Sequence, residues 1–208
     1  MALVKYNNNS ISAITAASGL SNGAMTLIKS QTASSSSTIS FVHGSSDVVL
    51  DSTYPIYLFK FINIHPATDA AEFQFQANAS GGSGYNETIT STLFQSIHSE
   101  DDTSESGLAY VSANDQANGT AFQDIYLNTG NGNDETCSGE LWLYGISSTT
   151  FVKHFMSTVQ GYHNSSSSFE YFCAGYFNTT SALDEFQFKF SSGNIDAGTI
   201  KLYGIKDS

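Results

Sequence analysis

The chain has 208 residues, 40% of them hydrophobic and 13% aromatic, so it is long enough for one large β domain or two small ones with a substantial apolar core. Acidic residues outnumber basic ones 19 to 7, for a net charge of −12, and without a cluster of Lys or Arg to neutralise phosphates the chain is not expected to bind nucleic acid. The same repulsion disfavours an anionic membrane surface, and no apolar run approaches the ~20 residues of a spanning helix.

The first 36 residues differ from the rest of the chain in composition and in the regularity of their apolar pattern. Residues 1–6 lead directly into three Asn residues, so no secretory signal is predicted. A run of Ser at residues 34–37 is typical of a flexible connection. Two interpretations stay open: residues 1–36 form an arm that attaches the protein to a partner, or residues 25–29 form an extra edge strand. Residues 37–208 are predicted to form a β-sandwich domain.

Apolar and polar residues alternate in short segments throughout that domain, as expected for strands with one face in the core. The 15 Phe and 11 Tyr suit such half-buried strands better than long helices. The strands are predicted at residues 38–43, 57–64, 72–76, 109–112, 122–127, 140–144, 151–159, 169–176, 186–190 and 199–202. Turn chemistry falls between them at residues 81–84, 118–119, 131–132, 192–194 and 197–198. This spacing predicts an all-β fold, namely a sandwich, jelly roll or barrel.

Two short sequences occur twice. Glu-Phe-Gln-Phe stands at residues 72–75 and again at 185–188, and Leu-Tyr-Gly-Ile stands at 143–146 and again at 202–205. We infer pseudo-symmetric β elements. Coincidence remains an alternative explanation, because strand alternation by itself makes sequences similar.

The pattern of nucleophiles, histidines and cysteines does not indicate catalysis. No Gly-x-Ser-x-Gly motif is present, and the five histidines are scattered singly, at His43, His65, His98, His154 and His163. Each is predicted to be structural, with His65 bonding a nearby carbonyl. The spacing of Cys137 and Cys173 does not suit a zinc site, so we expect two buried thiols on neighbouring strands. The chain is therefore predicted not to be an enzyme.

Two acidic clusters contain the hard oxygen ligands that calcium prefers. One is residues 100–102 with Glu105, and the other is Asp134 and Glu135 beside Asn131 and Asn133. Neither matches the EF-hand loop, and charge runs in loops are usually solvated, so no metal and no cofactor is predicted. The carboxylates of Asp101, Asp102 and Glu105 are the candidates for hydrolysis of a surface polymer, although nothing in the sequence predicts their separation.

Exposed aromatic residues could stack sugar rings, while the many Asn, Asp and Gln side chains could bond sugar hydroxyls. Tyr85, Tyr110, Tyr162 and Tyr176 stand near Gly, Ser or Asn and are the candidates for such a groove. The competing interpretation is that each ring is half-buried in a sheet with its hydroxyl in water.

Residues 54–85 and 186–205 together resemble a family of virion structural proteins of tailed bacteriophages, which includes cyanophage-type appendage and fibre components. The stronger signature is 186–205, which is similar to the closing hairpin of that family, with residues 192–198 as its tight loop. The similarity extends over residues 37–205 and is loose in the middle. Relatives often carry an Asp before the paired glycines, and Ala79 and Ser80 depart from that pattern.

The resemblance implies a jelly-roll-like antiparallel β-sandwich on the exterior of the virion, made in the host cytoplasm. The expected roles are capsid decoration, head fibre, or tail-associated fibre or knob. The expected partners are the major capsid protein or other virion structural proteins, and copies of the chain itself. Unpaired sheet edges promote aggregation, so a closed homo-oligomer, in particular a trimer, would cover them. The alternative function is a carbohydrate-binding module that recognises a host surface polysaccharide.

Overall fold

The computed structural model describes residues 24–206, and in this range the chain is all-β, with antiparallel strand pairs throughout. The strands are β1 (Met25–Thr32), β2 (Ile39–Val42), β3 (Ile56–Pro66), β4 (Ala71–Ala79), β5 (Ile89–Ser99), β6 (Ser106–Tyr110), β7 (Ala117–Gly119), β8 (Gln123–Thr129), β9 (Cys137–Tyr144), β10 (Lys153–His163), β11 (Ser167–Phe177), β12 (Leu183–Phe190) and β13 (Ile195–Ile205). A single 3-10 turn, Ser112–Asn114, lies among them. Among these residues no helix has the length and apolar character needed to span a membrane. The all-β prediction is confirmed.

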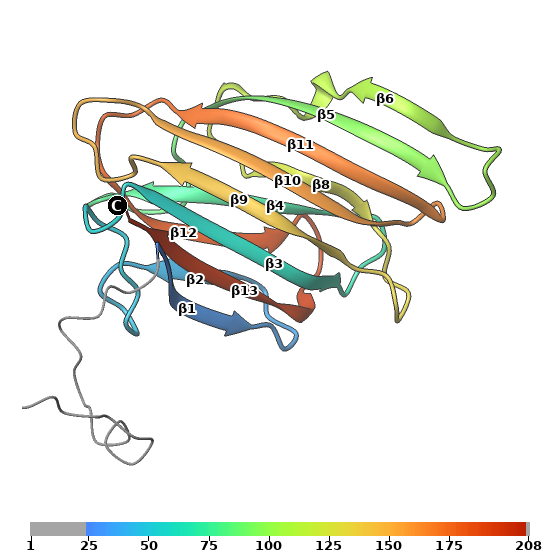
Figure 1. Cartoon of the computed structure of the whole chain (residues 1–208), viewed down its shortest axis with the longest axis horizontal. Coiled ribbons are helices and arrows are strands. Elements are labelled where there is room, and N and C mark those ends of the chain that lie inside the picture. Colours follow the sequence, from blue (N-terminus) through green and yellow to red (C-terminus); the bar gives the residue numbers. More distant parts are fainter. Residues whose placement is uncertain (1–23, 207–208) are drawn as a thin grey trace, which may run out of the picture.

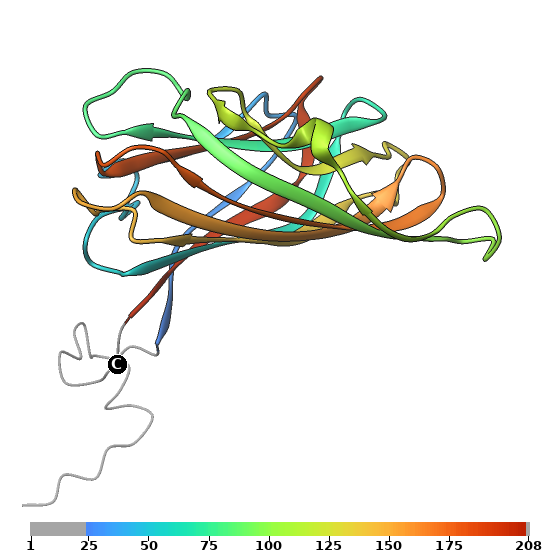
Figure 2. The same cartoon turned by 90° about the horizontal axis from the view of Figure 1, so that it is seen from above.

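The strands pair in two runs that meet at one bridge. The longer run has the order β1-β13-β3-β9-β10-β11-β5, with β6 and β7 both paired to β5. The shorter run is β8-β4-β12-β2, and it joins the longer one where His163 of β10 pairs with Thr129 of β8. Figure 1 shows the longer run in front of β4 and β12, and Figure 2 shows the same elements from above.

The core lies between the two runs, and phenylalanine is its most frequent residue. Phe75 of β4 lies 5.1 Å, between ring centroids, from Phe155 of β10, so side chains of the shorter run contact those of the longer run. Phe59 of β3 lies 4.8 Å from Phe188 of β12 in the same way. Strand alternation produces this arrangement, because every second residue of β10 from Lys153 to Gly161 is buried.

All ten predicted strands overlap observed strands, but the sequence analysis missed β5 and β7. Residues 118–119 and 197–198 were expected in turns, and both predictions were wrong, because these residues lie in β7 and β13. The pairing slips at both places, and Asn118 and Gly198 have φ values of 55° and 116°. Asn118 and Gly198, which tolerate positive φ, therefore occupy bulges inside strands and not turns between strands. For the same reason the loop before β13 is shorter than the predicted 192–198, since β13 begins at Ile195.

The N-terminal part of the described chain is a strand. β1 pairs with β13 from Met25 to Thr32 and forms one end of the longer run. The Ser-rich segment that follows it is held to the start of β13, where Ser36 bridges Ile195. Residues 1–23 of the expected arm lie outside the described residues.

The first repeated sequence occupies paired strands. Residues 72–75 lie on β4 and residues 185–188 on β12, where Phe75 pairs with Phe188. The second repeat differs between its copies, because Gly145 lies in a turn with a φ of 60° whereas Gly204 lies inside β13. A Cβ atom on Gly204 would stand 2.4 Å from the ring of Tyr54, so this glycine allows a close approach.

Candidate functional site

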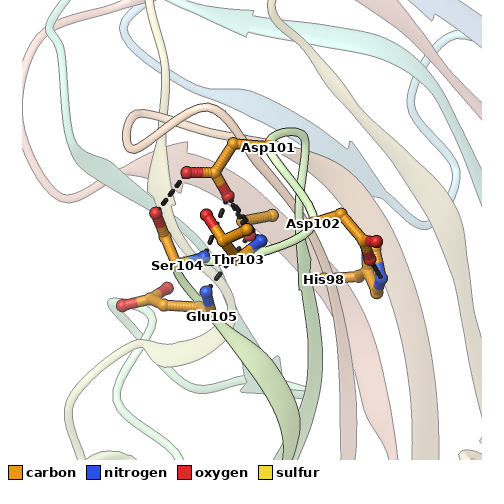
Figure 3. A network of polar contacts seen from close by, with 7 residues as sticks. His98, Asp101, Asp102, Thr103, Ser104 and Glu105 are labelled. Carbon is orange, nitrogen blue, oxygen red and sulfur yellow. Dashed lines mark hydrogen bonds and ion pairs between the residues drawn. The ribbon is translucent and has the colours of Figure 1, made fainter.

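The acidic cluster at residues 100–105 is a tight loop between β5 and β6 (Figure 3). The carboxylate of Asp101 accepts hydrogen bonds from the backbone N–H groups of Thr103 and Ser104, both at 2.9 Å, and from the Ser99 hydroxyl at 2.8 Å. The Ser104 hydroxyl also donates to it. These donors, above all the Ser104 hydroxyl, hold the pKa of Asp101 well below its usual range. Asp101 therefore organises its own loop.

Asp102 and Glu105 of this cluster make separate contacts. Asp102, whose side chain is 88% exposed, lies 3.2 Å from Nε2 of His98, and a pair so open to solvent contributes little to stability. The backbone N–H of Glu105 donates to the Ser99 hydroxyl. In the second acidic cluster, Glu135 accepts a hydrogen bond from the N–H of Gly132 at 2.7 Å and closes its own turn. Among residues 24–206, no three His, Cys, Asp or Glu residues are placed to share a metal ion.

Asp101→Ala should loosen this loop, because the N–H groups of Thr103 and Ser104 lose their acceptor. We expect their amide hydrogens to exchange about tenfold faster or more. Asp102→Asn is the matched control, since Asn tolerates the φ of 59° at this position, and it should leave exchange unchanged. In the unaltered protein the depressed pKa means that this protection persists below the ordinary Asp pKa of about 3.9 and is lost as the pH falls through the lower value. NMR-detected exchange over this pH range checks both statements.

The histidines lie apart and bond nearby groups. Nε2 of His65 lies 3.0 Å from the carbonyl oxygen of Gly132, which confirms the predicted carbonyl contact. Nδ1 of His43 accepts a hydrogen bond from the N–H of Leu50. His163 stacks on Phe169 at 4.0 Å, and burial lowers its pKa.

The cysteines are buried and free, as predicted, but they are not on neighbouring strands. Cys137 lies on β9 and Cys173 on β11, and β10 runs between them. Burial raises the pKa of both thiols, so neither is a reactive thiolate near neutral pH.

The four candidate tyrosines do not meet in one groove. Tyr85 lies in the loop between β4 and β5, where burial raises its pKa. Tyr110 lies on β6 and its hydroxyl bonds the carboxylate of Asp115. Tyr162 and Tyr176 lie on β10 and β11, where their register partners are Ser168 and His154.

A group of exposed and half-buried large apolar side chains lies on the side of the longer run that faces away from the core. We call it the aromatic face and define it by Phe94 (β5), Tyr110 (β6), Trp142 (β9), Met156 (β10) and Phe172 (β11). Its residues are cross-strand neighbours, since Met156 pairs with Trp142 while Phe94 pairs with both Phe172 and Tyr110. The rings of Phe94 and Phe172 stack at 4.8 Å with an interplanar angle of 10°. Neighbouring large apolar side chains in solvent are typical of an interaction surface.

The part of the aromatic face on β9, β10 and β11 carries little charge although the whole chain is strongly acidic, and beside β6 the carboxylate of Asp115 accepts a hydrogen bond from the Tyr110 hydroxyl. Glu140, next to Trp142 on the same side of β9, bonds Lys60, and it also accepts a hydrogen bond from the Trp142 indole at 2.8 Å. On β10 the outward residues His154, Met156, Thr158 and Gln160 include no carboxylate, and on β11 only Glu170 interrupts the outward series. Two copies of this surface could therefore approach each other without strong repulsion.

The aromatic face was not predicted from the sequence because its members are far apart in the chain. The available signal was a large apolar residue at the outward positions of alternating strands, as at Met156 within the predicted strand 151–159. Phe94 lies in β5, which was not predicted at all. Comparison of the chain with protein-family models, with curated proteins and with solved structures found no match.

Proposed function

We propose that this chain is a non-enzymatic structural protein on the exterior of a tailed-bacteriophage particle and that it assembles with copies of itself through the aromatic face. The proposal combines the resemblance of residues 54–85 and 186–205 to phage virion proteins with the apolar surface on the longer strand run. Capsid decoration, head fibre, and tail-associated fibre or knob are its possible positions, reached after synthesis in the host cytoplasm. The further partners are the major capsid protein or other virion structural proteins.

The finer fold belongs to the same proposal. We propose a jelly-roll-like β-sandwich in which the runs β1-β13-β3-β9-β10-β11-β5 and β8-β4-β12-β2 are the two sheets. The contact between Phe75 and Phe155 across the core supports this assignment. An experimental structure in which the two runs continue smoothly around one closed barrel would contradict it.

The single observation that carries the self-assembly is the continuity of the aromatic face with an open strand edge. Among the strands of residues 24–206, β6 pairs only with β5; all five of its residues are exposed, and Leu108 at its centre is 79% exposed. An open edge of this kind pairs readily with another strand, and a second copy offers the same edge and the same low charge. A closed oligomer, which we propose to be a trimer, would cover all edges of this type at once.

Met156→Glu should dissociate the assembly. A carboxylate at the centre of an apolar interface is desolvated without a partner, so we expect association to weaken by about 2 kcal/mol or more, roughly 30-fold. Leu27→Glu on β1 is the matched control, because Leu27 is 50% exposed and Met156 is 55% exposed, while β1 is at the far end of the longer run. Sedimentation equilibrium measures the effect, and an unaltered protein that stays monomeric at high concentration would refute self-assembly.

The position on the particle requires a separate experiment. Antibody labelling of intact virions, viewed by electron microscopy, should place the protein on the outer surface and distinguish the head from the tail. Absence of the protein from purified virions would contradict the structural role whatever its oligomeric state.

A second function, carbohydrate binding, is favoured by one specific observation. The end of β3, the start of β13 and the loop between β8 and β9 form a surface hollow that is lined mainly by polar side chains and shares no residue with the aromatic face. The chain would then recognise a host surface polysaccharide, either as its only role or in addition to its structural role.

A further inference from the structure

A surface hollow of about 660 Å³ lies where the end of β3, the start of β13 and the loop between β8 and β9 meet. Figure 1 shows the arrowhead of β3 and the yellow β8–β9 loop at the same end of the molecule. The hollow is lined mainly by polar side chains, among them those of Asn63, His65, Asn133, Asp134, Thr136 and Asp196. These residues come from three separate parts of the chain. The volume is within the ~300–1,000 Å³ of typical small-ligand sites.

Irregular pairing of two neighbouring strands forms the floor of the hollow. The register of β3 with β9 slips between Phe61 and Ile64, and the register of β13 with β3 slips on both sides of Ala197. Asn63 lies within the first slip at a φ of 50°, an uncommon conformation for a residue with a side chain. A Cβ atom on the facing Gly198 would stand 2.5 Å from the carbonyl oxygen of Asn63, so glycine is needed there. Bulges and strained residues of this kind are frequent at binding sites.

His65 and Asp196 are neighbours in the lining of the hollow, without a direct hydrogen bond between them. Nε2 of His65 lies 3.0 Å from the carbonyl oxygen of Gly132, so in the neutral ring Nε2 carries the proton and Nδ1 is an acceptor. Nδ1 is 4.0 Å from Oδ2 of Asp196, while Oδ1 of Asp196 accepts a hydrogen bond from the Ser35 hydroxyl at 2.6 Å. Nδ1 of His65 and Oδ2 of Asp196 are both acceptors, so they do not bond each other. A ligand hydroxyl beside them can donate a hydrogen bond to either atom.

We propose that the hollow binds a saccharide directly. The carboxylates of Asp196 and Asp134 would accept from sugar hydroxyls, and the amides of Asn63 and Asn133 can both donate and accept. Ile62, an exposed apolar residue at the edge of the hollow, would contact the C–H face of the ring. A lining that mixes donors, acceptors and an apolar patch matches a polyhydroxylated ring, whereas a calcium ion would need converging oxygen ligands alone.

The saccharide site and the proposed assembly rest on different residues. The hollow involves β3, β13 and the β8–β9 loop, and the aromatic face involves β5, β6, β9, β10 and β11. Failure of one proposal therefore leaves the other in place.

Saturation-transfer NMR with the full chain and a panel of methyl glycosides tests the site. The panel contains glucose, galactose, mannose, rhamnose and N-acetylglucosamine, and at least one should give a saturable signal. Asn63→Gly and Asp134→Asn should each weaken that binding about tenfold, which is the loss expected for one or two hydrogen bonds. Glycine removes the Asn63 amide and readily adopts its positive φ.

Two matched controls separate the hollow from general effects. Asn128→Gly makes the same change at an Asn with a φ of 50° in β8, and Asp47→Asn removes one charge from an exposed loop residue with a φ of 66°. Both should bind like the unaltered protein. Sedimentation of Asn63→Gly in parallel should match that of the unaltered protein, which keeps the assembly measurement independent.

Three results would overturn the proposal. The first is no saturable signal from any glycoside, and the second is an equal loss of binding in the variants and their controls. The third is binding that EDTA abolishes and added calcium restores, which would make the hollow a metal site instead of a direct saccharide site.

Discussion

Phe188→Ala is expected to lower the free energy of unfolding by about 3–5 kcal/mol, the cost of a large cavity in a packed core. Phe188 is fully buried in β12, and its ring centroid lies 4.8 to 6.4 Å from the rings of five other residues, namely Phe41, Phe59, Phe61, Phe73 and Phe75. These rings come from β2, β3 and β4 on both sides of the core. Truncation of Phe188 therefore removes contacts within the shorter run and between the two runs.

Urea denaturation followed by the fluorescence of Trp142, the single tryptophan, measures this loss. Phe151→Ala is the control, because Phe151 is 71% exposed and should change stability by no more than about 0.5 kcal/mol. All samples need the same protein concentration, since an assembling protein gains apparent stability by mass action. An equal effect of the two substitutions would mean that the phenylalanine cluster is not the core.

Gln76→Leu is the second substitution with a large expected effect, a loss of about 3 kcal/mol or more. Gln76 of β4 is fully buried, and its side-chain NH₂ group lies 2.9 to 3.3 Å from three backbone carbonyl oxygens, those of Glu87, Thr120 and Ala121. Its Oε1 accepts a hydrogen bond from the N–H of Ala77 at 2.8 Å. Leucine has a similar size but removes the acceptor of the buried Ala77 N–H and the donor to the half-buried Glu87 carbonyl, whereas the exposed Ala121 carbonyl keeps a hydrogen bond from the Gln116 side chain. Each buried group left unpaired costs about 1–3 kcal/mol.

Gln95→Leu makes the same change at a half-buried position of β5 and should be nearly neutral. In Gln76→Leu, amide exchange should also rise in the segments before β5 and β8, because the Gln76 side chain links both to β4. A variant as stable as the unaltered protein would show that water replaces the lost donors without cost.

The proposals of self-assembly and of saccharide binding rest on two surfaces that sequence reasoning did not assemble. The acidic loop at residues 100–105, which was the candidate for chemistry, proved to be a turn organised by Asp101. The candidate tyrosines proved to be dispersed over different elements. By contrast, Met156 and Asn63 carry the two functional proposals, and neither was a candidate from the sequence.

The strands that were predicted share one property, regular alternation of large apolar side chains, as in Glu-Phe-Gln-Phe at residues 72–75. β5 was missed because Ser and Thr occupy many of its positions and interrupt the alternation of large apolar side chains. Its buried Ile89 and Leu93 nevertheless face the core. Asn118 and Gly198 were assigned to turns because their tolerance of positive φ is a local property, whereas its use in a bulge depends on the partner strand.

The amino-acid sequence alone determined the all-β class, the acidic net charge and most of the strands. It could do so because alternation, composition and charge are properties of neighbouring residues. Only the tertiary structure decided which outward side chains meet, because cross-strand neighbours such as Phe94 and Phe172 are set by pairing between distant segments. The hollow between Asn63, Asp134 and Asp196 depends in addition on where β13 slips in register against β3. The position of this slip cannot be predicted from the local sequence of either strand.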